Sequence, residues 1–329
     1  MPENLPVPTS GGWFAEWVAS GKLPGAAKAI AQLIGDTANA GSAWVNIATA
    51  KGEQIQQRIR TETAGSSAIM EALAAEAAKL GASDPAVVEV ALRQLGSSAV
   101  RKHLNKASVL QNAADEMNSG DPIGDAPPDI EDDWLNRFED LAAGASSERM
   151  QKLLGRVLAG EIRKPGAFSF ATLNFVDVLD TQVATSLSAM APFIIAYDFI
   201  PFTSRFNFTD MFDRILDLKH YGIISDEITR KTKFNPDKKQ LFTVARTGFM
   251  VGGISEEEMS LDILPLTRVG KEIFPLIECS LSDDQTNEFV DHLFGHIKAE
   301  WIEIGTVKLI DRDNGIFTPV SRRNRPGNI

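Results

Sequence analysis

Residues 150–174, MQKLLGRVLAGEIRKPGAFSFATLN, decide how the centre of this chain folds. From Met150 onward the apolar residues recur three and four positions apart, which is the pattern of a helix that buries one face. One further turn along that face lies Glu161, where another apolar residue is expected. Pro165 disfavours helix at the residue before it, and Gly166 permits a sharp exit. The pattern therefore predicts a helix, a corner and a second helix.

The carboxylate of Glu161 has two interpretations. A carboxylate on a buried helix face is costly unless it is paired or hydrogen-bonded. The second helix, which Ser169 is placed to cap, offers free backbone N–H groups and a positive dipole end. We therefore predict that Glu161 is a structural latch, and that Glu161→Ala costs about 1–3 kcal/mol of stability. The alternative is a catalytic carboxylate, although no second acid, base or metal ligand is apparent near it in the sequence.

A further amphipathic helix precedes this corner, since Trp134, Phe138 and Leu141 follow the i, i+4, i+7 spacing. The whole segment 129–180, DIEDDWLNRFEDLAAGASSERMQKLLGRVLAGEIRKPGAFSFATLNFVDVLD, resembles a bacterial family known as domain of unknown function 2806. Eight residues of this segment form the structural motif that we single out: Trp134, Phe138, Met150, Gln151, Glu161, Pro165, Gly166 and Ser169.

The resemblance implies a helical core and supplies no catalytic residues. It has one departure, Leu154, where family members usually carry a tryptophan, and this swap leaves the corner unchanged. The segment is also more distantly similar to the abortive-infection alpha proteins. That second similarity implies a role in bacterial defence against phage.

Composition excludes several classes of protein. The chain has 329 residues, of which 43% are hydrophobic, and a net charge of −11. An acidic chain can meet duplex DNA only through a local basic patch. The single cysteine, Cys279, excludes an intrachain disulfide and a cysteine-rich zinc site, and its surroundings in the sequence indicate a packing residue. We predict no cofactor, because no phosphate-binding glycine motif is present.

Shifts in composition predict five segments along the chain. The N-terminus reads as flexible, a helical region follows, and an acidic segment rich in proline and glycine reads as a linker before the family core. We predict a mainly α-helical fold whose last segment is an α+β module resembling a winged helix. The predicted segments are 1–22 (flexible), 23–114 (alanine-rich helices), 115–128 (acidic linker), 129–200 (family core) and 201–329 (α+β module).

The alanine-rich helical region has few charges along its first half, which suits close packing against another helix or contact with a membrane surface. An ordinary helix in a bundle is the alternative. We expect self-association or a protein partner here. We also expect a cytoplasmic protein, with contact at a membrane face as the alternative, because no secretory signal and no apolar run of spanning length is apparent.

The α+β module combines an amphipathic helix ending in YGII, a predicted hairpin, and a helix opened by LT-x-x-G. This order of elements resembles winged-helix modules, which bind DNA or proteins. Basic residues gather in its hairpin, and a solvated basic loop, or one that meets the acidic linker, is the alternative to phosphate contact. The candidate nucleic-acid contacts are Arg230, Lys231, Lys233, Lys238 and Lys239. The tail SRRNRPGNI adds Arg322, Arg323 and Arg325, which could also touch phosphates.

Two histidines, His292 and His296, lie one helical turn apart and have a spacing that can hold a metal. No third ligand is apparent, so we predict no metal site and regard the pair as weak candidates. Three functions stay open. The first is a non-enzymatic interaction or oligomerisation protein, the second a nucleic-acid-binding regulator, and the third a metal-dependent hydrolase or nuclease.

Overall fold

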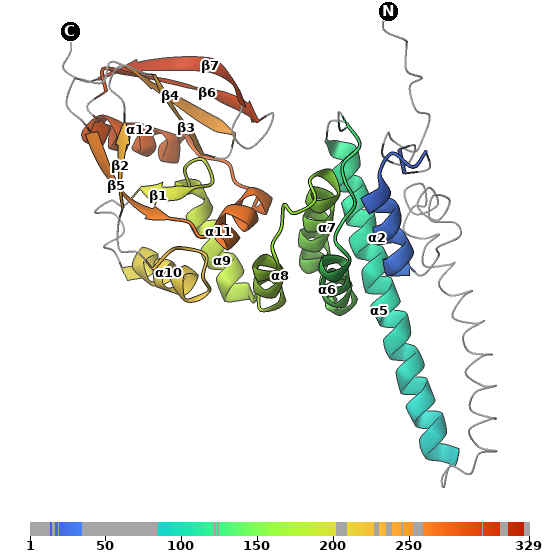
Figure 1. Ribbon diagram of the computed structural model, residues 1–329. Coiled ribbons are helices and arrows are strands. Elements are labelled where there is room, and N and C mark those ends of the chain that lie inside the picture. The colour runs from blue at the N-terminus through green and yellow to red at the C-terminus, as the bar shows by residue number, and fades with distance from the viewer. Residues whose placement is uncertain are drawn as a thin grey trace, which may run out of the picture. The chain divides into compact units, whose positions relative to one another are not determined.

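The computed structural model describes most of the chain from Pro85 onward and a shorter part before it. The described residues fall into two compact units, Met1–Leu173 and Asn174–Ile329, which we treat separately (Figure 1). The described ranges are 20–34, 85–120, 125–201, 209–226, 230–234, 239–244, 246–252, 259–297, 299–309 and 315–325, together with Phe14, Trp17, Val18 and Ile123.

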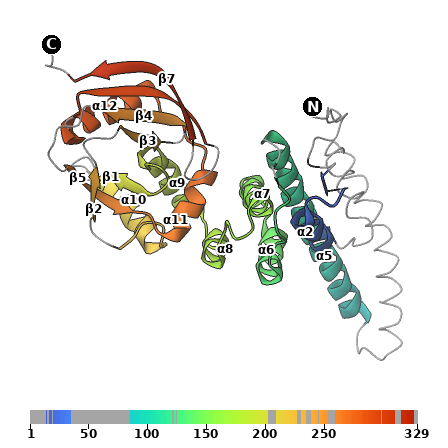
Figure 2. The same ribbon diagram turned by 45° about the horizontal axis from the view of Figure 1, so that its top comes forward.

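The first unit is a bundle of helices around α5 (Pro85–Ser119). Helices α2 (Pro24–Ile34), α6 (Asp132–Gly144) and α7 (Glu148–Arg163) all pack against α5 or its neighbours (Figures 1 and 2). The apolar stripe predicted in α7 is its buried face, and it ends in the buried Glu161. Helix α5 continues to Ser119, so the first residues of the segment 115–128 are helical.

Helices α5 and α7 approach each other closely because Gly155 lies at their crossing. A Cβ added there would lie 2.5 Å from the Asn112 side chain and 2.9 Å from the backbone nitrogen of Ala113. Backbone atoms cannot rotate away as a side chain can, so only glycine fits this position without moving the two helices apart.

Polar contacts tie α2 and α6 to the bundle. Lys106 of α5 and Gln32 of α2 both donate to the Glu139 carboxylate of α6, at 2.8 and 3.2 Å. Burial opposes ionisation of Glu139, but these donors hold its pKa below the usual range. Lys28 donates to the Asp132 carboxylate and to the carbonyl of Ile130, both at 2.5 Å, and the Asp132 contact raises the pKa of Lys28.

The second unit begins within α8 (Phe170–Asp177), which both units share. It continues through α9 (Thr181–Met190), β1 (Phe199–Pro201) and α10 (Thr209–His220). A three-stranded antiparallel sheet has the order β1-β5-β2, with β2 spanning Arg230–Phe234 and β5 spanning Met259–Pro265. Helix α11 (Arg268–Ile273) follows β5, and its Thr267 cap accepts from the Gly270 N–H.

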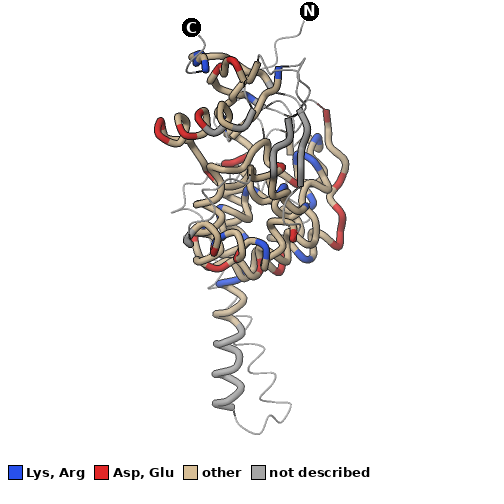
Figure 3. The backbone as a smooth tube through the Cα atoms, turned by 90° about the vertical axis from the view of Figure 1, so that its left-hand side faces the viewer, with Lys and Arg blue, Asp and Glu red and all other residues tan. Residues whose placement is uncertain are grey.

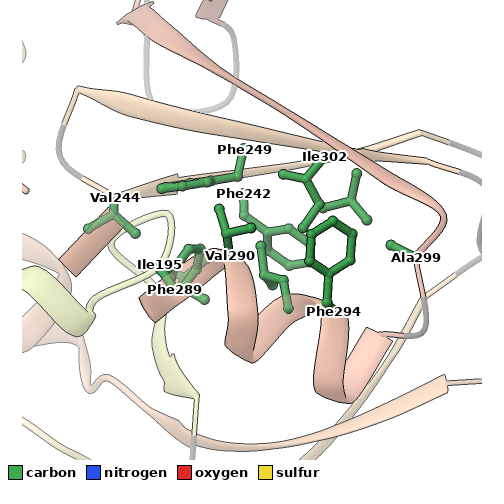
Figure 4. Packing of buried hydrophobic residues seen from close by; sticks show 11 residues of the cluster. Ile195, Phe242, Val244, Phe249, Phe289, Val290, Phe294, Ala299 and Ile302 are labelled. Atoms are coloured by element: carbon green, nitrogen blue, oxygen red, sulfur yellow. The ribbon is translucent and has the colours of Figure 1, made fainter. Parts of the chain in front are cut away.

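A second, four-stranded antiparallel sheet has the order β3-β4-β6-β7. One face packs on α12 (Asp283–Ile297) through aromatic and aliphatic side chains from both layers (Figure 4). Phe249 and Phe289 have ring centroids 4.6 Å apart at the centre of this core. The strands are Gln240–Val244, Thr247–Gly252, Trp301–Leu309 and Gly315–Asn324.

Strand β7 forms one edge of this sheet, and its pairing with β6 is interrupted in the middle. Ile304 pairs with Ser321 while Gly305 pairs with Pro319, so Val320 is an extra residue that bulges from the ladder. Val320 is 76% exposed. A bulge and a proline are both devices that stop another strand from adding to an edge.

The prediction of a mainly α-helical protein with an α+β C-terminal part is confirmed. The described strands all lie in the second unit, and all but β1, which begins at Phe199, lie beyond the family core of residues 129–200.

Candidate functional site

The corner predicted from the sequence is a single tight turn. Helix α7 ends at Arg163, and the Ala167 N–H donates to the Lys164 carbonyl at 3.0 Å. Pro165 occupies the second position of this turn, and Gly166 the third with a φ of 82°. A positive φ at that position is the mark of a type II turn, in which proline followed by glycine is the preferred pair.

Glu161 lies near the C-terminal end of α7, and its side chain reaches across the tight turn that follows the helix. Its side chain is 2% exposed. One carboxylate oxygen accepts from the Gly166 N–H at 2.6 Å, and the other accepts from the Phe168 N–H at 3.1 Å. These donors belong to the turn and its exit, not to the first turn of α8 as the sequence suggested. The carboxylate therefore holds the chain in its turn.

Phe168 is the residue where three parts of the corner meet. Its N–H donates to Glu161, and its carbonyl accepts from the Trp134 indole N–H of α6 at 2.7 Å. Its ring lies against Gly160, where an added Cβ would come within 2.6 Å of a ring carbon. Helix α6, helix α7 and the segment that leaves the turn are thus joined through both the backbone and the side chain of Phe168.

The remaining motif residues support the same corner. Phe138 stacks on Trp134, with ring centroids 5.2 Å apart. The Met150 N–H donates to the Ser147 hydroxyl that caps α7, and Gln151 donates to the Ala145 carbonyl at 2.9 Å. Ser169 precedes α8, and its hydroxyl accepts from the Thr172 N–H at 3.4 Å.

A second arrangement, which the sequence did not indicate, surrounds Trp301 on the four-stranded sheet. The Arg322 guanidinium carbon lies 4.4 Å and the Lys239 ammonium 5.2 Å from the centroid of the Trp301 ring. Such distances are typical of cation–π contacts. Lys239 was a candidate nucleic-acid contact and Arg322 belongs to the basic tail that could also touch phosphates, whereas Trp301 was assigned no role. Only the strand pairing brings these three residues together, since they lie far apart along the chain.

The other candidate contacts are described less fully. Arg230, Lys231 and Lys233 belong to β2, with Lys231 paired to Asp262 and Lys233 paired to Ser260 of β5. Their side chains, and all of Lys238, lie outside what the structure describes.

The predicted metal and thiol candidates give no assembled site in the described part of the chain. The side chains of His292 and His296 lie outside the described residues. In the remainder, no group of three or more histidine, cysteine or acidic side chains is placed to hold a metal. Cys279 is half-buried, and burial raises the pKa of its thiol, which disfavours a reactive thiolate.

Helix α10 exposes apolar side chains that the core does not use. Ile215 and Leu218 are buried, whereas Phe212 is 49% and Leu216 48% exposed on an adjoining face of the helix. These two residues are one helical turn apart, so they form one continuous patch, here called the α10 patch.

The described residues thus define a mainly helical protein whose central segment is organised by a latched corner. Residues 93–199 match the model of a family described as protein of unknown function (DUF2806). This match confirms the resemblance seen in residues 129–180 and extends it in both directions. None of the comparisons supports a likeness to the abortive-infection alpha proteins. The searches of curated proteins and of solved structures each gave no match.

Within the described ranges, no helix combines the length and the apolar character that crossing a membrane requires.

Proposed function

We propose that this protein is a non-enzymatic, self-associating protein, and that the α10 patch is the contact between two copies. The observation that carries this proposal is the sequence of α10 read outward from Leu216. Phe212 and His220 lie four residues to either side of it, and Asp213 and Lys219 lie three residues to either side.

This arrangement is complementary to itself under a two-fold rotation. If two α10 helices cross antiparallel at Leu216, each Leu216 meets its own copy. Each Phe212 then lies opposite the other copy's imidazole of His220, and each Asp213 opposite the other copy's Lys219. A two-fold contact must pair a surface with itself in this way. Side-chain exposure agrees, because Phe212, Asp213, Leu216 and His220 are all exposed.

The test is the mass of the full chain in solution, measured by light scattering during size-exclusion chromatography. We expect a dimer for the unmodified protein and a monomer for Leu216→Asp, which places two like charges at the two-fold axis. Ile316→Asp, which changes an exposed apolar residue of β7, is the matched control and should remain dimeric.

Charge reversal gives a sharper test of the register. Asp213→Lys should weaken the dimer, and adding Lys219→Asp to the same chain should restore it. A monomeric unmodified protein rules out the proposal. An oligomer that Leu216→Asp leaves intact rules out the α10 patch and would transfer the contact to another surface, such as the N-terminal helices.

A nucleic-acid-binding winged helix is the second candidate function. It is supported by the strand order β1-β5-β2, with α10 between β1 and β2 and α11 directly after β5. The described exposed face of α10 opposes it, because a helix that enters a DNA groove needs basic or neutral polar residues there. Phe212, Asp213 and Leu216 suit a protein surface better. Duplex binding abolished by Lys231→Gln and Lys233→Gln together would reverse this preference.

For the cellular role we propose phage defence, which rests on the weaker family resemblance alone. Phage should form fewer plaques on cells that express the unmodified chain than on cells that express Leu216→Asp. Equal plaque numbers on the two would remove this role.

A further inference from the structure

The four-stranded sheet has two different faces. Helix α12 covers one of them, and among the described elements none covers the other (Figures 1 and 4). We call this second face the outer face. Because side chains alternate along a strand, Trp301 and Glu303 of β6 lie there, while Ile302 between them points into the core.

The outer face is flat around Trp301 because glycines lie beneath the aromatic rings. A Cβ added at Gly252, which pairs with Trp301, would overlap the indole ring. A Cβ at Gly305 would come within 2.8 Å of the Phe317 ring from β7. Both rings therefore lie across the sheet surface and do not stand up from it. The two rings come from neighbouring strands, β6 and β7, and form a platform of aromatic rings on this face.

Two cations flank the tryptophan on this platform. The Arg322 guanidinium lies over the Trp301 ring, and the Glu303 carboxylate, 3.9 Å from Arg322, helps to hold it there. Lys239 approaches the same ring from the start of β3. The Arg322 side chain is 51% exposed, so its planar group is accessible from solvent. Nucleic-acid bases stack on both aromatic rings and arginine planes.

The outer face carries more basic than acidic side chains around Trp301, although the chain has a net charge of −11. Two basic side chains, Lys239 and Arg322, and one acidic side chain, Glu303, gather at the ring. Figure 3 marks the basic and the acidic residues along the backbone. Lys308 and Arg323 do not belong to this face: Arg323 pairs with Ile302 and donates to Asn287 of α12, and Lys308 has the same place in the alternation of β6 as Ile302. An anionic ligand complements these two cations at the ring.

We propose that the outer face binds single-stranded nucleic acid, with a base stacked on the Trp301–Arg322 pair and phosphates near Lys239 and Arg322. A single strand fits better than a duplex, because a flat aromatic platform engages bases that are unpaired and accessible. It also fits better than an acidic protein segment, whose carboxylates would use the cations but not the aromatic rings. This site is separate from the α10 patch, and it does not depend on self-association.

The test is the fluorescence anisotropy of a labelled oligothymidylate of about 20 nucleotides, titrated with the full chain. Binding should weaken steeply between about 50 and 200 mM salt. Trp301→Leu should lower the affinity by about tenfold or more, whereas Trp301→Phe, which keeps a ring, should retain most of it. Arg322→Gln should weaken binding and reduce the slope of log affinity against log salt by about 0.7, the contribution of one phosphate contact.

The matched control is Lys308→Gln, which removes one charge at the other end of β6 and should change affinity little. Circular dichroism confirms that each variant is folded. The proposal is overturned if no binding occurs at the lowest salt, or if Lys308→Gln weakens binding as much as the platform variants do. It is also overturned if polyphosphate, which lacks bases, or polyglutamate, an acidic peptide, competes as well as oligothymidylate does.

Discussion

Replacing Glu161 by glutamine changes one oxygen to an NH₂ group and keeps the size of the side chain. In the native corner both oxygens accept backbone N–H groups, at 2.6 Å from Gly166 and 3.1 Å from Phe168. A glutamine can accept only one of these bonds. Its NH₂ group then faces the other N–H, and two donors meet in a site where the native side chain is 2% exposed.

The magnitude follows from these contacts. A hydrogen bond to a charged group contributes about 1.5–3 kcal/mol, and a buried donor without a partner costs about 1–3 kcal/mol. Both figures describe the loss of the same hydrogen bond, so they are not added. We therefore expect Glu161→Gln to destabilise the first unit by about 2 kcal/mol. Glu161→Ala removes both acceptors and should cost more, up to about 4 kcal/mol.

Guanidinium unfolding followed by circular dichroism measures this loss. Hydrogen exchange with mass spectrometry localises it, because the amides of Gly166 and Phe168 should exchange faster in Glu161→Gln. The control is Glu148→Gln, the same change on the same helix, where the side chain is 79% exposed and should have a much smaller effect. If Glu161→Gln matches this control in both stability and exchange, the carboxylate is not a latch, and our account of the corner is wrong.

Three further predictions concern the rest of the chain. Gly155→Ala should destabilise the first unit by about 1–3 kcal/mol in chemical unfolding, because the new Cβ meets the backbone of α5, whereas Gly144→Ala has open space and should be close to neutral. Because the pKa of Glu139 is depressed in the folded protein, its ionised form stabilises the fold. This contribution is complete above pH about 4.5 and is lost as the pH falls through the folded-state pKa. Glu139→Gln should therefore make the melting temperature fall less steeply with pH on the acid side. Ala196 has a φ of 51°, a conformation that glycine adopts more readily than alanine. Ala196→Gly should therefore raise the free energy of unfolding of the second unit by about 0.5–1 kcal/mol.

The local elements of the fold were predictable because their signals lie within a few residues of each other. Pro85 begins α5 as expected from the preference of proline for a first helical position. Ser282 and Gln285 form a capping box, in which each side chain accepts from the other's backbone N–H, and this pattern can be read from four consecutive residues. The division of the C-terminal strands into two sheets was not predictable, since strand pairing over long separations leaves no trace in local periodicity.

The corner was more accessible to sequence reasoning than the two surfaces used in our proposals. A charged residue on an apolar stripe, followed by proline and glycine, indicates Glu161 without any knowledge of tertiary structure. Its partners were assigned less accurately, because the carboxylate reaches the turn and not the helix beyond it. Trp301 and Arg322 meet only through the register of β6 with β7, and a bulge in that register is invisible in the sequence. Alternation in β6 was the one available signal, as it separates Trp301 and Glu303 from Ile302.

The interrupted edge of the four-stranded sheet bears on how the protein behaves when it is concentrated. A regular, fully extended edge strand can pair with the edge strand of an identical chain, and repeated pairing builds filaments. Here Pro319 has no backbone N–H to donate. The neighbouring bulge at Val320 also makes the spacing of the remaining backbone donors and acceptors irregular. Growth of a fibre by strand addition at the β7 edge is therefore disfavoured.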